Sequence, residues 1–253
     1  MIVYLFDGSF EGLLTSIYDS YYSKPHADYI YSKQQYKYNL LDDAKHIDTD
    51  LEKYEKVYKA IETKISKNAL NKIYLAYLSD MYDCYSYIYR YVVMGFKVGC
   101  EIDLHKNNDT VIYIDNCAKK VSLERHRMMG FVRFKSFNNI LISKINPTHN
   151  VLELIAKHFS KRLSNENFII YDENRDLALI YNKSSYYITN VDDKFKKMLE
   201  SIDDNFYEEL WSEYFNSVNI PERENKKLQS RMMPKRYWKN LSETSNIESK
   251  EKV

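Results

Sequence analysis

Three short apolar runs, separated by short polar turns, stand close together in the second half of the chain. They occupy residues 168–171, 177–181 and 186–189, and each has the length of a strand rather than of a helix. The residues between them are rich in Asp, Asn and Ser, which favour tight turns. These runs predict three strands joined by short turns in a mostly antiparallel sheet.

Two more strands are predicted just upstream. Gly130 ends a helical pattern, and residues 131–134 then alternate in character as a strand does. The pair Asn138-Asn139 is typical of a hairpin turn, and residues 140–145 form the expected return strand. The C-terminal half should therefore contain about five mostly antiparallel strands packed against helices.

The chain opens with an apolar run at residues 2–6, which predicts one strand. The turn Asp7-Gly8-Ser9 leads into an apolar stripe with helical spacing, and Ser9 is the expected N-cap. Residues 24–48 show little pattern and predict an irregular connection with one short strand near Tyr29. The N-terminal half is thus expected to begin with a strand, a turn and a helix.

Helical periodicity dominates the rest of the first half. A capping box from Thr49 to Glu52 predicts one amphipathic helix, and the broad apolar face of residues 69–93 predicts a long central one. A further helix is expected from Ile112 or Cys117 to Met129.

Two more helices are expected later in the chain. Thr148 or Asn150 is the expected cap of the first, and apolar residues between 206 and 218 predict the second.

The expected fold class is α+β, with a helical N-terminal half opened by one strand and a C-terminal half of strands packed against helices. Gly95, Gly99 and the polar residues 101–109 place the boundary between the halves near residue 105. The chain would then consist of a mostly helical part at 1–105, an α+β domain at 106–243 and a polar tail at 244–253.

Composition excludes several classes of protein. A net charge of +1 gives no global field for a polyanion, so any surface for nucleic acid must be a local patch. The 25 tyrosines are more than stacking needs, and most are expected at half-buried positions. Three widely spaced cysteines indicate neither disulfides nor a metal site, which favours a reducing, cytoplasmic setting. No cofactor motif, metal spacing, secretory leader or membrane span is expected.

Several stretches resemble a bacterial family of probable DNA metabolism proteins that contain a C-terminal domain of unknown function (DUF4130-like). The stretches are YLFDGSFEGLLTSIYDSYY, ERHRMMGFVRF, INPTHN, HFSKR, IYDENR and ERENKKLQSRMMPKRYWKNL. The resemblance implies a role in DNA repair or modification. It also implies association with a radical-SAM protein and with uracil-DNA glycosylase, to which similar proteins are sometimes fused. Similar proteins often have a histidine in the RMMPKRYW turn, whereas this chain has Met232 and Met233.

Basic and aromatic residues gather between residues 220 and 241, where neither helix nor strand periodicity holds. Cations neutralise phosphates and aromatic faces stack on bases, so this composition suits exposed nucleic acid. The alternative is a solvated tail whose two aromatic rings dock on the core. The candidate nucleic-acid-binding residues are Arg223, Arg231, Lys235, Arg236, Tyr237 and Trp238.

Arg127 and Arg133 flank Gly130 and are further candidates for binding phosphate. On a strand, Arg133 would share a face with Phe131 and would need a buried partner. Glu124, Asp172 or Asp176 could serve as that partner, and the result would be a structural ion pair. The functional alternative is an anion pocket lined by both arginines.

His158, with Arg162 one turn later, and His149 are the candidate catalytic residues. A histidine beside a cleft can transfer protons near neutral pH, and Arg162 could hold phosphate there. A core histidine that donates to a backbone carbonyl is the structural alternative. Asp172 and Arg175 are expected to cap a turn and to pair with each other.

Three functions remain open. The chain is expected to be a DNA metabolism or repair accessory protein that binds nucleic acid. The alternatives are a DNA-processing enzyme that uses a His and Arg cleft, and an adaptor that docks a radical-SAM partner.

Overall fold

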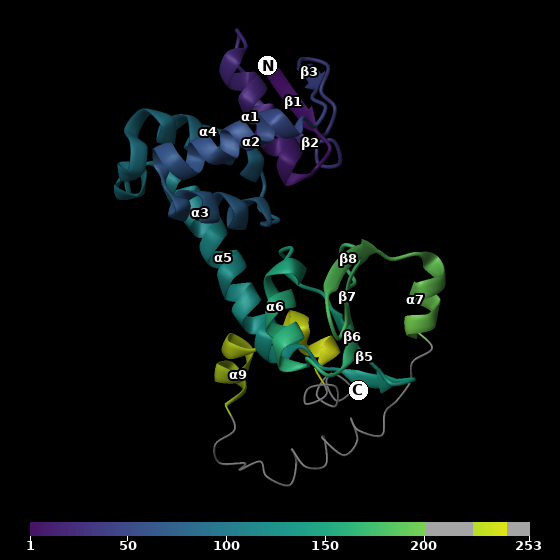
Figure 1. Cartoon of the computed structure of the whole chain (residues 1–253). Helices are drawn as coiled ribbons and strands as arrows, with labels where there is room; N and C mark the ends of the chain where they lie inside the picture. Colours follow the sequence, from purple (N-terminus) through teal and green to yellow (C-terminus); the bar gives the residue numbers. More distant parts are fainter. Residues whose placement is uncertain (201–224, 242–253) are drawn as a thin grey trace. The chain divides into compact units, whose positions relative to one another are not determined.

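The computed structural model describes residues 1–200 and 225–241 (Figure 1). The chain divides into two compact units, Met1–Leu123 and Glu124–Val253. The division lies inside helix α5 (Asp109–Phe131), whereas residue 105 lies in the turn before that helix. The other elements of the first unit are β1 (Ile2–Phe6), α1 (Phe10–Tyr22), β2 (Tyr29–Ser32), β3 (Asp43–His46), α2 (Leu51–Ala60), η1 (Ile61–Ile65), α3 (Lys67–Tyr77), α4 (Cys84–Val98) and η2 (Gly99–Leu104).

The first unit contains a three-stranded parallel sheet in the order β2-β1-β3. The expected strands at residues 2–6 and near Tyr29 are confirmed, and β3 was not predicted because three of its four residues are polar and exposed. Ser9 caps α1 by accepting a hydrogen bond from the Gly12 N–H, as expected. Helix α4 is fastened to β2 by Ser86, whose hydroxyl bonds both the N–H and the carbonyl of Ile30.

Two expectations for the first unit are wrong. Asp50, rather than Thr49, caps α2 by accepting from two backbone N–H groups, because Thr49 donates its hydroxyl to Asp7 instead. The single helix expected at residues 69–93 is two helices, α3 and α4, separated by residues 78–83. The break coincides with Asp83, whose left-handed backbone (φ 57°) cannot continue a helix.

The second unit is built on a five-stranded sheet in the order β4-β5-β6-β7-β8. All neighbouring strands are antiparallel except β5 and β6, which are parallel and are connected through helix α6. An α+β fold with a mostly antiparallel sheet is therefore confirmed. The elements described here are β4 (Lys135–Phe137), β5 (Ile140–Ile145), α6 (Leu152–Arg162), β6 (Asn167–Asp172), β7 (Leu177–Asn182), β8 (Tyr186–Asn190), α7 (Asp193–Glu200), α9 (Lys226–Met232) and η4 (Lys235–Asn240).

The hairpin between β4 and β5 turns at Asn138 and Asn139, as predicted. Both residues have positive φ angles, 48° and 62°, which a tight two-residue turn between antiparallel strands requires. Helices α6 and α7 lie on opposite faces of the sheet (Figure 1). Phe195 of α7 packs against a cluster that includes Ile169 and Tyr171 of β6. On the other face, Phe134 contacts both Phe159 of α6 and Phe168.

Two further expectations for the second unit, a strand and a helix cap, are wrong, and a third falls outside the described residues. Residues 131–134 are not a strand, because α5 continues through Gly130 to Phe131 and β4 begins only at Lys135. Neither Thr148 nor Asn150 caps α6, because Val151 occupies the cap position and makes no side-chain hydrogen bond there. The helix expected between residues 206 and 218 lies outside the described residues.

Candidate functional site

The loop between β5 and α6, residues 146–151, lies at the centre of the candidate site. Ile145, the last residue of β5, pairs in parallel with Asp172, the last residue of β6. The chain therefore leaves both strands at the same edge of the sheet. In sheets with parallel strands, ligands often bind at the carboxyl ends of those strands.

A buried carboxylate, Glu124 of α5, holds one side of this loop. Its side chain is 2% exposed and accepts the backbone N–H groups of Thr148 (2.9 Å) and His149 (2.6 Å). The Tyr237 hydroxyl donates to the same carboxylate at 2.5 Å, and the Arg236 guanidinium donates at 3.2 Å. The negative charge is thus satisfied by two backbone groups and two side chains, as a buried carboxylate requires.

Glu124 was named from the sequence only as a possible partner of Arg133, so its central role was missed. A signal was nevertheless present in the helical pattern. Val121, Glu124 and Met128 follow one another at spacings of three and four, and all three are buried on α5. A carboxylate on an apolar stripe indicates a buried partner network.

The other side of the loop is held by the turn after β6. Arg175 donates to the carbonyls of Pro147 and Thr148 and to the Asp172 carboxylate at 3.2 Å. Asn174 adds a second bond to the Pro147 carbonyl, at 2.8 Å. Burial raises the pKa of Asp172 even though Arg175 opposes the shift. The predicted pairing of Asp172 with Arg175, and the turn capped by Asp172, are confirmed.

One polar atom of this loop, the buried Asn146 Oδ1 atom, has no hydrogen-bond partner among the described residues. The hydroxyl of Ser143 on β5 is likewise buried without a partner there. Buried polar groups are nearly always paired, so an unpaired one needs an explanation. The loop thus combines a tightly held backbone with an unsatisfied amide oxygen.

Tyr237 and Trp238 anchor the C-terminal segment to the second unit. They are 3% and 4% exposed, and the Trp238 indole donates to the Met233 carbonyl at 2.8 Å. Burial and the bond to Glu124 raise the pKa of Tyr237 to about 12, so its phenol stays a donor at neutral pH. Both rings are buried, so neither exposes a face on which a base could stack in this arrangement. The alternative, docking on the core, is what the structure shows.

The basic residues of this segment surround the two anchors. Lys235 lies over the Trp238 ring, 5.5 Å from its centroid, and Arg236 lies 4.6 Å from the centroid of Tyr237. Arg231 is exposed on α9. Arg223 lies outside the described residues.

The two candidate histidines occupy different environments. The His149 backbone belongs to the loop held by Glu124, and the residue is 7% exposed. The His158 ring packs edge-on against Phe159, and its Nε2 atom is buried with no hydrogen-bond partner in the part of the chain that the structure describes. Proton transfer requires a nitrogen that reaches the reacting group, which a buried Nε2 does not. Arg162 is exposed at the end of α6.

The arginines near Gly130 belong to the end of α5 and the residues just after it. Arg133 is half-buried and donates to the Gly130 carbonyl at 2.8 Å, which follows from its place after a helix rather than on a strand. Within the described part of the chain, each carboxylate expected to pair with it has another cation. Those pairs are Glu124 with Arg236, Asp172 with Arg175 and Asp176 with Lys196. Arg127 is half-buried on α5.

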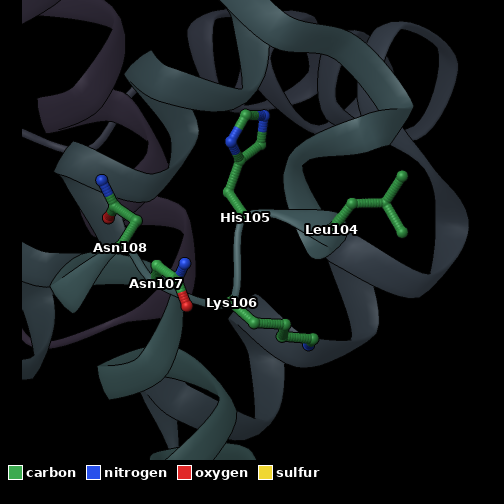
Figure 2. A pocket seen from close by; sticks show the side chains of 5 residues that line it. All are labelled: Leu104, His105, Lys106, Asn107 and Asn108. Atoms are coloured by element: carbon green, nitrogen blue, oxygen red, sulfur yellow. The ribbon is translucent and has the colours of Figure 1, made fainter.

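A shallow hollow of about 410 Å³ in the first unit is lined by five consecutive residues, Leu104 to Asn108. Figure 2 shows that the side chains of Leu104, His105 and Lys106 point in different directions from this turn. Catalytic groups must converge on a reacting atom, so this hollow does not indicate an active site.

Within residues 1–200 and 225–241, no three His, Cys, Asp or Glu side chains are grouped as metal ligands. The helices of these same residues include none that is both long and apolar enough to cross a membrane.

Fold and site together define an α+β protein in which a buried glutamate and a buried aspartate hold one loop, and the same glutamate fastens a basic C-terminal segment. The chain belongs to the DUF4130 family, a domain of unknown function, whose model matches residues 83–243. The expected relation to this domain is therefore confirmed. No curated protein matches the chain. No solved structure matches it either.

Proposed function

We propose that the chain is an accessory protein of DNA metabolism or repair that binds nucleic acid through its C-terminal basic segment, residues 225–241. The charge of this segment carries the proposal. Its 17 residues include six Lys or Arg and no Asp or Glu, although the whole chain has a net charge of only +1. Such a concentrated patch is the electrostatic signature of a surface for phosphates.

Anchoring makes this segment a defined surface. Tyr237, Trp238 and Leu241 are buried. The neighbouring cations Lys235, Arg236 and Lys239 are therefore held near the protein rather than on a free tail. Glu124 takes up part of the charge of Arg236, and Glu173 contacts Lys239 at 3.3 Å. A segment ordered before binding loses less conformational entropy when it meets its ligand.

Lys227 and Arg231 are the best residues for a test. Both are exposed on α9, and their spacing of four places them on one face of the helix. Neither takes part in the Glu124 cluster, so their replacement should leave the fold intact. Arg125, exposed directly after Glu124 on α5, adds positive charge in the same unit.

The experiment is a titration of labelled single-stranded and duplex DNA by fluorescence anisotropy at several salt concentrations. Replacing two phosphate-binding cations should reduce the slope of log affinity against log salt by about 1.8 for duplex and about 1.4 for single strands. The Lys227→Ala and Arg231→Ala double variant is compared with Lys64→Ala and Lys97→Ala, which removes the same charge from exposed sites in the first unit.

Weaker binding only in the first double variant is the expected result. Equal weakening in both variants would show that bulk charge alone is responsible. Absence of DNA binding at low salt would refute the proposal and would favour the alternative, in which the segment docks a protein such as the radical-SAM partner. In the enzyme alternative, His158 would have to act through its Nδ1 atom, because its Nε2 atom is buried.

A further inference from the structure

A pocket of about 470 Å³ lies within the first unit, and none of its lining residues takes part in the candidate site described above. This volume is within the range of small-molecule sites. Its walls come from two stretches, one running from the end of β2 toward β3 and the other joining α3 to α4. Three tyrosines and three aspartates make up most of the lining: Tyr31, Tyr36, Tyr82, Asp42, Asp80 and Asp83.

The charge of the pocket is negative. Three carboxylates face one cation, Lys37, which is exposed at the rim. The Asp42 carboxylate is partly balanced, because its Oδ1 atom lies 3.7 Å from the Met1 ammonium and its Oδ2 atom accepts the Tyr36 hydroxyl at 3.1 Å. A concave surface with an excess of carboxylates attracts cations and repels phosphates.

Asp83 offers one carboxylate oxygen to a ligand. It precedes α4 but makes no capping bond to that helix, and its Oδ1 atom accepts the Tyr31 hydroxyl at 2.6 Å. Among the described residues, its Oδ2 atom accepts no hydrogen bond. Burial and the bond to Asp83 raise the pKa of Tyr31 well above its ordinary value, so Tyr31 remains the donor in this pair.

The aromatic part of the lining suits the apolar body of a cation. Tyr82 is 83% exposed, which is unusual for a large aromatic side chain that lines a pocket. The Tyr31 ring lies 6.0 Å from the ring of Tyr36, and the two form an aromatic wall. Cations bind the faces of such rings, as Arg90 already does on Tyr29 at 5.3 Å.

We propose that this pocket binds a small organic cation, a guanidinium or primary ammonium group on a short apolar frame. The charged group would pair with Asp83, and the frame would lie against Tyr82 and Tyr31. This site does not depend on the proposed function, because its negative charge disfavours nucleic acid and all its lining residues belong to the first unit.

The test uses the full chain and two probes of similar shape, butylguanidinium and the neutral butylurea, titrated by calorimetry and by ligand-observed NMR. Butylguanidinium should bind with a saturable curve. Butylurea should bind at least about tenfold more weakly, because a charged group bonds to a carboxylate more strongly than a neutral one does. Equal affinity for the two probes, or no saturation by butylguanidinium at millimolar concentration, would overturn the proposal.

Variants locate the binding. Asp83→Asn should weaken butylguanidinium binding about tenfold, and asparagine tolerates the left-handed backbone of this position, so the fold is kept. Tyr82→Leu should weaken it about three-fold, whereas Tyr82→Phe keeps the ring and should not. The control is Glu101→Gln, an exposed acid outside the pocket. If Glu101→Gln weakens binding as much as Asp83→Asn does, the cation is attracted by general charge and the site assignment is wrong.

Discussion

The substitution Glu124→Gln tests the central contact of the second unit. Glutamine keeps the shape of the side chain but replaces one carboxylate oxygen by an NH₂ group. Three donors meet Oε1, namely the Thr148 N–H, Tyr237 and Arg236, whereas the His149 N–H meets Oε2 at 2.6 Å. With the amide oxygen placed at Oε1, its NH₂ group must face the His149 N–H, and two donors then oppose each other.

The magnitude follows from these contacts. Losing the charged bond to the His149 N–H costs about 1.5–3 kcal/mol. The ion pair with Arg236 adds about 1 kcal/mol or less, because the arginine side chain is 49% exposed. We therefore expect Glu124→Gln to lower the free energy of unfolding of the second unit by about 3 kcal/mol.

Urea unfolding followed by far-UV circular dichroism measures this loss, and hydrogen exchange of the His149 amide locates it. That amide should exchange faster in the variant. Glu166→Gln, an exposed acid of the same unit, is the matched control and should change neither quantity. A loss below about 1 kcal/mol together with unchanged protection at His149 would refute the assigned role of Glu124.

Two more substitutions test the groups around this loop. Because the pKa of Tyr237 is raised to about 12, the stability that its protonated phenol provides is present below pH 10 and is lost as the pH rises through 12. Tyr237→Phe should therefore flatten the fall in stability between pH 9 and 12, measured as the urea midpoint, and an unchanged fall would contradict its bond to Glu124. Arg175→Met should cost about 3–5 kcal/mol, because it leaves the buried Asp172 without a cation, whereas Asp172→Asn should cost far less. Thermal unfolding of both variants checks this order, and the reverse order would refute the role given to Arg175.

Four of the five strands of the second unit, β5 to β8, could be predicted because each signal was local. The Asn138-Asn139 turn and the runs near 168–171 and 177–181 depend only on neighbouring residues, and the structure has strands there. The sequence predicted a mostly antiparallel sheet but did not show which strands would be parallel. The parallel pairing of β5 with β6 depends on where α6 returns the chain. Helix ends were less predictable. Gly130 was expected to end a helix, but α5 continues through it, and a β-carbon added at this position would meet open space.

The candidate site was predicted only in parts. Arg236 and Tyr237 were named for their charge and ring, but their shared partner Glu124 lies 112 and 113 residues earlier, which no local pattern reveals. The break between α3 and α4 was missed because the local pattern was misleading. The apolar stripe of residues 69–93 continues across the break, so periodicity alone predicted one helix, and the pocket beside Asp83 was not predicted.

The long separation between Glu124 and its partners has a consequence for synthesis of the chain. Protein chains emerge from the ribosome N-terminus first, and domains generally fold as units. Until residues 236 and 237 emerge, the Glu124 carboxylate lacks both of its side-chain donors, so its burial is unfavourable. The second unit should therefore reach its final packing only late in translation, and a chain that stalls before the basic segment would present an incomplete unit to chaperones and proteases.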